Sequence, residues 1–351
     1  MRRSLLTLLV AAPLLLGQQK KILVTGLTDQ VAKELQSVVP GARIVSLLPT
    51  PAGDYPRLAS PMPRTDAERE QFYRELADAD AYIGAPRREI IKAGPKLKWV
   101  QVTSAGVEPY RYPELLNSDI VITNFQKVAS AAIADHAMAL LLALTRELTY
   151  YIPIRTQEVW GKPQILARDL EGATAVVIGV GGIGSEISKR AWACGMKVIG
   201  VDPEDINPSP FLLKTVYPDR LDTVLPEADV VFISAPDTPA SHKMMGARQF
   251  GLLKKGALFI AVSRGGLYDM DALVAALKEG RLAGAGVDVT DPEPLPKGHP
   301  LWRFENVVIT PHIATRSQNE LRRQLDVVKD NLVRFVNGEP LRYVVDKQKW
   351  Y

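Results

Sequence analysis

Apolar-rich runs of strand length alternate with amphipathic stretches through the first part of the chain. The runs are residues 21–25, 43–47, 81–84 and 99–103, and the helical stretches are 28–39 and 67–77. Strands separated by helices predict a parallel sheet with helices packed on its faces. The proline-rich segment 48–63 predicts a solvated connection. We therefore expect one α/β domain here.

A second series of the same kind opens at Ala173. Its predicted strands are residues 173–178, 197–201, 230–234, 258–262, 284–289 and 307–310. Six strands with intervening helices are typical of a doubly wound parallel sheet, the architecture that binds dinucleotides. The fold class we expect is α/β, with such a sheet in the second half.

Two further segments have helical character. Ser130–Leu148 contains no proline or glycine and is apolar almost all round, which predicts one long helix buried between domains or subunits. Residues 155–169 show little periodicity and predict an extended arm. Residues 317–336 predict an amphipathic helix that ends the fold.

The first seventeen residues differ from everything after them. A basic start, Met1–Ser4, is followed by an apolar run from Leu5 to Leu16 and then by polar residues. This order is typical of a secretory signal, and the run is too short to span a bilayer comfortably. Arg2 and Arg3 also loosely match a twin-arginine signal. We expect export to the periplasm and no stable membrane span in the mature chain; a cytoplasmic protein is the alternative.

Composition narrows the possible partners. The chain is 46% hydrophobic and 23% charged, which is the profile of a folded globular protein. Its 43 basic and 39 acidic residues are interspersed, so no nucleic-acid partner is expected. The single cysteine, Cys194, excludes an internal disulfide and a thiolate metal cluster. We expect it to be a small buried residue.

A glycine-rich turn follows the strand 173–178. Gly179, Gly181, Gly182, Ile183 and Gly184 lie between that strand and a helix predicted over 185–193. Such glycines permit a tight turn, close approach to a pyrophosphate, and close packing of the helix on its strand. Asp202 ends the next strand, where a carboxylate binds ribose hydroxyls and repels a 2′-phosphate, so NAD is favoured over NADP. A turn that binds nothing and a methyltransferase are the alternatives.

Three chemically active side chains follow strands of the second series. Arg264 follows the strand 258–262, Glu293 lies in the loop after 284–289, and His312 follows 307–310. An arginine fork binds a carboxylate, an imidazole delivers a proton to a developing alkoxide, and a carboxylate beside the imidazole favours its protonated form. Each residue alone is more often structural than catalytic. Their shared placement predicts reduction of a keto acid. No metal-ligand spacing is visible, so no metal is expected.

With these residues in place, the chain from about Lys21 onward resembles the D-isomer-specific 2-hydroxyacid dehydrogenase family. Besides the glycine-rich turn and the three active residues, the matching motifs are Lys98–Gln101, Ser104–Val107, Ser234–Pro236 with Thr238, Phe250–Gly256, Val262–Gly265, Asp288–Pro296, His299–Trp302 and Thr310–His312. The chain departs from the common pattern at Ala261 and Asp135, where the family usually has Asn and Glu. Neither departure removes an active group.

The resemblance implies two Rossmann-like domains. One is a flavodoxin-like substrate domain formed by residues 20–122 with 317–351, and the other is a NAD-binding domain over 123–316. It implies substrate-carboxylate binding by the backbone N–H groups of Ala105, Gly106 and Val107, together with Arg264. It also implies cofactor contacts at Ala235, Pro236, Thr238 and Val262, with Ser263 and Asp288 near the nicotinamide. A homodimer through the helix 130–148 is likewise implied.

The sequence therefore predicts an NAD-dependent oxidoreductase that interconverts a small 2-keto acid and a D-2-hydroxy acid. The Ser-Ala-Gly-Val loop resembles the glyoxylate and hydroxypyruvate reductase branch. Phosphoglycerate or another D-2-hydroxyacid oxidation is an alternative, for which Arg87 and Arg88 offer cations. A non-catalytic NAD-sensing or scaffold protein is the alternative of a different class.

Overall fold

The computed structural model describes residues 19–49, 58, 60–161 and 167–350. They form two compact units. Unit 1 comprises the chain up to Thr103, Pro109–Thr123 and Leu325–Val345, and unit 2 comprises Ser104–Glu108, Asn124–Gln324 and Asp346–Tyr351. The predicted signal segment, most of the 48–63 connection and the middle of the 155–169 arm lie outside the described residues.

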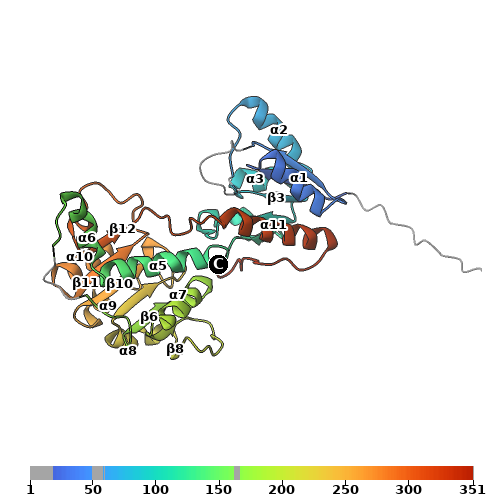
Figure 1. Cartoon of the computed structure of the whole chain (residues 1–351). Helices are drawn as coiled ribbons and strands as arrows, with labels where there is room; N and C mark the ends of the chain where they lie inside the picture. Colours follow the sequence, from blue (N-terminus) through green and yellow to red (C-terminus); the bar gives the residue numbers. More distant parts are fainter. Residues whose placement is uncertain (1–18, 50–57, 59, 162–166, 351) are drawn as a thin grey trace, which may run out of the picture. The chain divides into compact units, whose positions relative to one another are not determined.

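Unit 1 is a five-stranded, fully parallel sheet with strand order β2-β1-β3-β4-β5. This is the flavodoxin-like order. Its elements are β1 (Lys21–Thr25), α1 (Asp29–Val38), β2 (Arg43–Leu47), α2 (Asp66–Leu76), β3 (Ala81–Ile83), α3 (Arg88–Ala93), β4 (Trp99–Gln101), α4 (Pro113–Leu116), β5 (Val121–Thr123) and most of α11 (Glu320–Asn337) (Figure 1).

A buried polar network attaches the C-terminal helix α11 to the sheet of unit 1. The indole N–H of Trp99 donates to the Thr123 hydroxyl at 2.8 Å, and that hydroxyl donates to Gln101 at 2.8 Å. Asn331 on α11 donates to the same Gln101 oxygen at 3.2 Å. The four side chains are buried. Each polar group has a partner, so burying them is compatible with a stable core.

Unit 2 is a seven-stranded parallel sheet with order β12-β11-β10-β9-β6-β7-β8. The order reverses between β6 and β9, which is where this architecture binds ligands. Its elements are α5 (Ser130–Thr145), α6 (Leu148–Ile154), β6 (Thr174–Ile178), α7 (Gly182–Ala193), β7 (Lys197–Val201), β8 (Lys214–Val216), α8 (Leu221–Val224), β9 (Val230–Ile233), α9 (Ala247–Leu252), β10 (Ala257–Ala261), α10 (Met270–Lys278), β11 (Leu282–Val287) and β12 (Val307–Ile309) (Figure 1).

Both faces of the unit 2 sheet are covered by helices. Alternate residues of β6 enter different cores: Val176 and Ile178 pack on the side of α8, α9 and α10, and Ala175 and Val177 on the side of α5 and α7. This two-sided burial explains why the strands are continuous apolar runs in the sequence. The predicted fold class, two parallel α/β domains, is confirmed.

The long helix predicted over Ser130–Leu148 is wrong at its C-terminal end. α5 ends at Thr145, and α6 begins at Leu148 after a break at Glu147, whose φ of 59° lies in the left-handed region. No single helix among the described residues is long and apolar enough to cross a membrane, although α5 and the segment 148–157, bent by 77°, pass that test together.

Several smaller expectations need correction. The short elements α3, β5 and β8 were not predicted, because three to six residues give little periodicity. α7 begins at Gly182, three residues earlier than predicted, and Cys194 after its end is exposed, not buried. Unit boundaries also differ from the predicted domain boundaries, because Ser104–Glu108 and the last six residues belong to unit 2.

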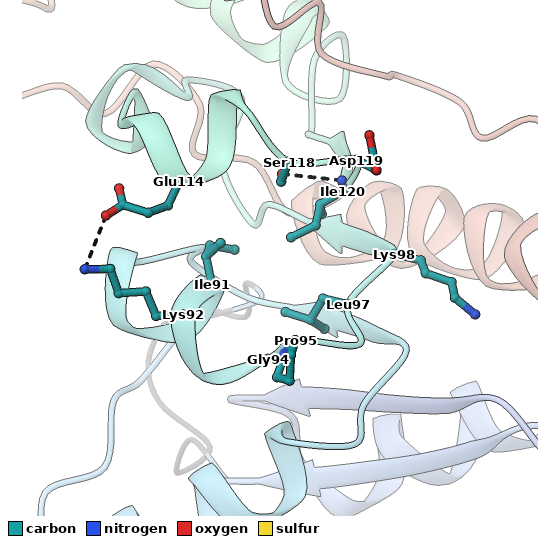
Figure 2. A pocket seen from close by; sticks show the side chains of 10 residues that line it. All are labelled: Ile91, Lys92, Gly94, Pro95, Leu97, Lys98, Glu114, Ser118, Asp119 and Ile120. Carbon is teal, nitrogen blue, oxygen red and sulfur yellow. Dashed lines mark hydrogen bonds and ion pairs between the residues drawn. The ribbon is translucent and has the colours of Figure 1, made fainter.

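Unit 1 has a cavity of about 500 Å³ at the amino ends of β4 and β5 (Figure 2). Ile91, Leu97 and Ile120 form its apolar lining, and Glu114 lies at its rim. One carboxylate oxygen of Glu114 binds Arg88 and Lys92, and these contacts lower the pKa of Glu114 to about 2. None of the predicted site residues lines this cavity.

Candidate active site

The three predicted active residues follow β10, β11 and β12, which are neighbours in the sheet. His312 Nδ1 lies 2.7 Å from Glu293 Oε2, and both side chains are more than a third exposed. Glu293 is itself fixed, since its other oxygen accepts the Thr290 N–H at 3.0 Å. The carboxylate thus orients the imidazole and leaves its Nε2 as the nitrogen available to a substrate.

Asp288 braces the loop that presents His312. Its buried carboxylate accepts the N–H of Ile313 and of Ala314, both at 2.9 Å, and the hydroxyl of Thr310 at 2.5 Å. His312 has a φ of 53°, in the left-handed region that favours glycine, so its loop needs such support. The predicted place of Asp288 near the nicotinamide stays a prediction.

The two glycines that follow Arg264 let its loop come close to the loops that contain Thr290 and Asp237. A Cβ on Gly265 would stand 2.0 Å from the Thr290 carbonyl oxygen, and one on Gly266 would stand 2.1 Å from Asp237 Oδ2. Glycine is required at position 265, where the conflict is with backbone, whereas a Cβ at position 266 would displace the end of the Asp237 side chain. Arg264 is therefore held beside the loop that contains Glu293, although 29 residues separate them in sequence.

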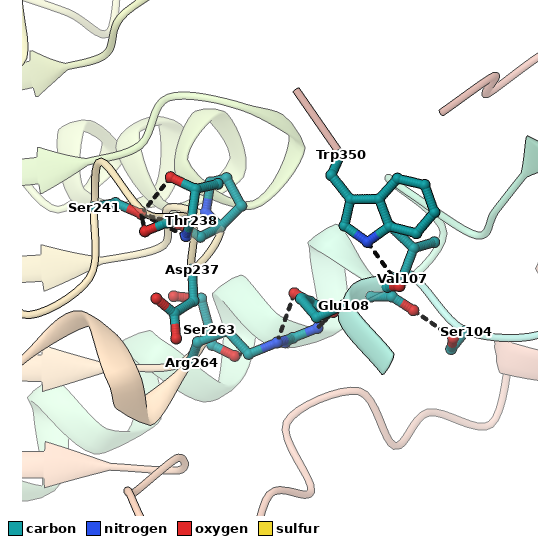
Figure 3. Close-up of polar contacts among 12 residues, drawn as sticks. Ser104, Val107, Glu108, Asp237, Thr238, Ser241, Ser263, Arg264 and Trp350 are labelled. Carbon is teal, nitrogen blue, oxygen red and sulfur yellow. Dashed lines mark hydrogen bonds and ion pairs between the residues drawn. The ribbon is translucent and has the colours of Figure 1, made fainter. Parts of the chain in front are cut away.

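The guanidinium of Arg264 contacts Glu108 (Figure 3). Nε donates to Glu108 Oε1 at 3.1 Å and Nη2 to Oε2 at 3.4 Å, while Nη1 donates to the Ser263 carbonyl at 2.7 Å. A Cβ on Gly106 would stand 2.0 Å from Nη2, so the predicted substrate loop lies directly against Arg264. The structure thus brings Arg264 and Ala105–Val107 together.

Every carbonyl of the loop 104–107 accepts a hydrogen bond from the protein. The donors are Phe125 N–H to Ser104, Asn124 Nδ2 to Ala105, Ser104 Oγ to Gly106, and Trp350 Nε1 to Val107, at 2.6 to 3.0 Å. Within the described part of the chain, the N–H groups of residues 105, 106 and 107 have no acceptor. With the carbonyls held and three N–H groups left over, the loop suits an anion such as a carboxylate.

The glycine-rich turn has the shape that a dinucleotide needs. Gly179 has a φ of 85°, and a Cβ there would stand 2.6 Å from the backbone of Ala235, at the point where the strand order reverses. A Cβ on Gly184 would overlap the Gly179 carbonyl at 1.8 Å. At Gly181, by contrast, no described atom lies within 4 Å, so that position faces open space. The turn and the first N–H groups of α7 fit a pyrophosphate.

The other predicted cofactor residues lie around the same strand ends. Asp202 accepts the N–H groups of Val180 and Glu204, which points its carboxylate at the turn. Pro236 and Thr238 form a loop closed by Ser241, at 2.6 and 2.9 Å. Val262 is buried, and the Ser263 hydroxyl donates to the Ile233 carbonyl. Whether these residues touch a cofactor stays a prediction.

Four residues that lie near the site were not predicted from the sequence. Glu108 and Trp350 contact the site loops, as described above. His136 on α5 lies 2.8 Å from the Thr310 hydroxyl and 3.5 Å from Asp288, which joins α5 to the His312 loop. Asp237 pairs with His242 at 3.2 Å. Two of them carried a sequence signal: Glu108 directly follows the predicted substrate loop, and Asp237 lies between the predicted cofactor residues Pro236 and Thr238.

The fold and the site define a class, the nicotinamide-dinucleotide-dependent dehydrogenases of 2-hydroxy acids. Comparison with known proteins supports the same class. Residues 138–314 match the family model described as D-isomer specific 2-hydroxyacid dehydrogenase, NAD binding domain. The chain is 32% identical over 292 residues to a glyoxylate reductase of Thermofilum pendens, covering 80% of this chain and 85% of the relative.

Two further matches bear on substrate and cofactor. A D-3-phosphoglycerate dehydrogenase of Methanocaldococcus jannaschii is 29% identical over 286 residues, which cover 80% of this chain and 54% of that protein. A crystal structure of a D-isomer specific 2-hydroxyacid dehydrogenase from Xanthobacter autotrophicus Py2, in complex with NADPH and MES, superposes with a TM-score of 0.76 at 25% identity. It covers 95% of this chain and 100% of that chain.

The chain belongs to the D-isomer-specific 2-hydroxyacid dehydrogenase family. It is an oxidoreductase that acts on CH–OH groups with a nicotinamide dinucleotide as cofactor. Among the described residues, no group of three or more His, Cys, Asp or Glu side chains could hold a metal ion.

Proposed function

We propose that this dehydrogenase reduces a small 2-keto monocarboxylate of the glyoxylate or hydroxypyruvate type with NADH. The observation that carries the proposal is the loop 104–107, whose carbonyls are all held by the protein and whose N–H groups stand free beside Arg264. Such a loop binds one carboxylate. Similarity to a glyoxylate reductase over 85% of that relative supports a small substrate.

The protein groups divide the work of reduction. Residues 105–107 and Arg264 bind the substrate carboxylate and turn the keto carbon toward the cofactor, which supplies the hydride when bound. His312 gives a proton from Nε2 to the keto oxygen, which completes the hydroxyl group and leaves a neutral imidazole. Glu293, at 2.7 Å from Nδ1, holds the ring so that Nε2 faces the substrate.

We propose NAD as the cofactor in preference to NADP. The carboxylate of Asp202 would repel a 2′-phosphate. Lys349 is a cation that comes close to this region, but it forms an ion pair with Glu204 and so brings little net charge. The prediction is that kcat/KM with NADH exceeds that with NADPH at least tenfold. Equal values for both cofactors would contradict this part of the proposal.

The proposed function is tested by NADH oxidation with glyoxylate, hydroxypyruvate, pyruvate and phenylpyruvate, compared with 3-phosphohydroxypyruvate. His312→Ala should lower kcat about 10²–10⁴-fold and leave the Kd of NADH unchanged. His299→Ala, in a loop of the same unit, is the matched control. Wild-type turnover in His312→Ala would refute the mechanism. A preference for the phosphorylated acid would favour phosphoglycerate oxidation, although Arg88, one of its predicted cations, is paired with Glu114.

We also propose a homodimer and an exported protein. Large apolar side chains of α6 and the following arm are exposed: Leu148, Tyr150, Tyr151, Ile152, Val159 and Trp160. A second copy would cover them, and light scattering would detect a species of twice the 38.6 kDa chain mass. Export is supported only by the pattern of residues 1–17. Cell fractionation that recovers the full-length chain in the cytoplasm would reject it.

A further inference from the structure

Glu108 occupies one defined edge of the Arg264 guanidinium. A guanidinium has five N–H donors, which form two parallel pairs, one from Nε with Nη2 and one from Nη1 with Nη2. Glu108 takes the first pair, at 3.1 and 3.4 Å. The fifth donor, on Nη1, points back toward the chain and meets the Ser263 carbonyl at 2.7 Å.

What remains is a single pair of donors at the tip of Arg264. One N–H of Nη1 and one of Nη2 point away from the backbone, in the geometry that binds two oxygens at once. The same guanidinium lies against Gly106, in the loop whose three free N–H groups suit an anion. The contact with Glu108 therefore decides which edge of Arg264 a substrate carboxylate can use.

The backbone that carries Glu108 is also held in place. The loop before it is held by Asn124 at Ala105. It is also held by the Trp350 indole at Val107 (Figure 3). Glycine at position 106 leaves room for both side chains, since a Cβ there would stand 2.5 Å from Glu108 Oε2 and would displace its carboxylate. A carboxylate on a backbone held in this way can orient its partner.

The charge of Glu108 has a second consequence. With Glu108 beside it, Arg264 presents two directed donors but little net positive charge. One substrate carboxylate is still bound by these donors and by the loop N–H groups. A second anionic group on a substrate bound beside Arg264 would be repelled by the Glu108 carboxylate, and the Arg264–Glu108 pair has no net positive charge to offset this repulsion.

We propose that Glu108 is a positioning and specificity residue: it sets the edge of Arg264 that receives the substrate and selects monocarboxylates over substrates with a second negative charge. This inference rests on the proposed function for the identity of the reacting group, a 2-keto acid. It adds a residue to the Arg264, Glu293 and His312 set and gives a physical reason for the uncharged substituent of the proposed substrate.

The test compares substrates that differ by one carboxylate, pyruvate and oxaloacetate, at saturating NADH. In Glu108→Gln the ratio of kcat/KM for oxaloacetate to that for pyruvate should rise about tenfold over wild type. The kcat for pyruvate should fall about tenfold, because Arg264 is less well oriented. KM should not rise, because the net charge of the pair formed by Arg264 and residue 108 becomes more positive. Glu305→Gln, an exposed carboxylate of the same unit, should behave as wild type.

A charge-conserving variant separates charge from packing. Glu108→Asp should keep the wild-type substrate ratio while kcat falls, since the carboxylate stays but is one methylene shorter. An equal change of ratio in the Asp and Gln variants would overturn the inference. So would a ratio in Glu108→Gln within twofold of wild type, with an unchanged thermal midpoint.

A measurement on the wild-type enzyme guards against a variant that does not fold. Its preference for pyruvate over oxaloacetate should weaken as ionic strength rises from 0.05 to about 1 M, because salt screens the repulsion. A salt-independent preference, or a preference for the doubly charged acid, would overturn the role of Glu108. Wild type that ignores glyoxylate and hydroxypyruvate but reduces pyruvate would refute the proposed substrate and leave the Glu108 ratio measurable.

Discussion

The brace at Asp288 gives the sharpest test of how this site is built. Asp288→Asn keeps size and shape but replaces one carboxylate oxygen with an NH₂ group. With the remaining oxygen toward Thr310 and Ile313, the NH₂ group faces the N–H of Ala314, which is buried and loses its acceptor. A buried N–H without a partner costs about 1–3 kcal/mol.

The two surviving hydrogen bonds also weaken, because their acceptor is no longer charged. Each loses at least about 0.5 kcal/mol, since bonds to charged groups are worth about 1.5–3 kcal/mol and neutral ones about 1. The sum predicts a loss of at least about 2 kcal/mol. At roughly 2–4 °C for each kcal/mol, the thermal midpoint of unit 2 should fall by at least about 4 °C.

Two measurements check this. Hydrogen exchange of a peptide covering Thr310–Arg316 should accelerate in the variant, and kcat should fall about 10²-fold because a displacement of His312 of about 1 Å is enough for such a loss. Asp291→Asn, the same substitution at an exposed position nearby, should change stability by less than about 0.5 kcal/mol. Unchanged exchange in Asp288→Asn would refute the brace. Faster exchange with wild-type kcat would show that the brace does not position His312.

Three further outcomes are expected. Glu293→Gln should lower kcat roughly 10–10²-fold and leave NADH binding unchanged, since a neutral amide is a weaker acceptor than a carboxylate and orients the His312 ring less well; unaltered kcat in stopped-flow assays would contradict the pairing. Trp350→Phe should raise substrate KM several-fold by freeing the Val107 carbonyl, and an unchanged KM would count against the role of the C-terminal segment. Because the pKa of Glu114 is lowered to about 2, its carboxylate stabilises unit 1 above pH 4.5, and that contribution disappears as pH falls from 4.5 toward 2. Urea unfolding of Glu114→Gln should therefore show destabilisation at pH 7 that vanishes near pH 2. A difference in unfolding free energy between variant and wild type that does not depend on pH would contradict this role of Glu114.

Most of the sheet in each unit could be predicted because its signal is local. A strand buried on both faces must be apolar at every position, as in Ala175–Ile178, and this pattern is visible without any partner. The break at Glu147 was not predictable in the same way. Thr145–Leu148 contains neither glycine nor proline, so only the packing around it selects a left-handed residue there.

Active residues could be predicted when a strand end presented them. Arg264, Glu293 and His312 each follow a strand, and the carboxyl ends of parallel strands lie at one edge, so their placement followed from topology. The contacts of Glu108 could not be predicted, because it is 156 residues from Arg264. Trp350 is 243 residues from the carbonyl it binds.

The sequence by itself determined two parallel α/β units, the glycine-rich turn with Asp202, and the chemical set for reducing a 2-keto acid. These are properties of single segments, so each segment specifies them alone. Only the tertiary structure decided that Asp288 braces the loop of His312, that Glu108 takes one edge of Arg264, and that the chain end holds the substrate loop. Such pairings join segments far apart in the chain, and they exist only after the core of unit 2 has packed.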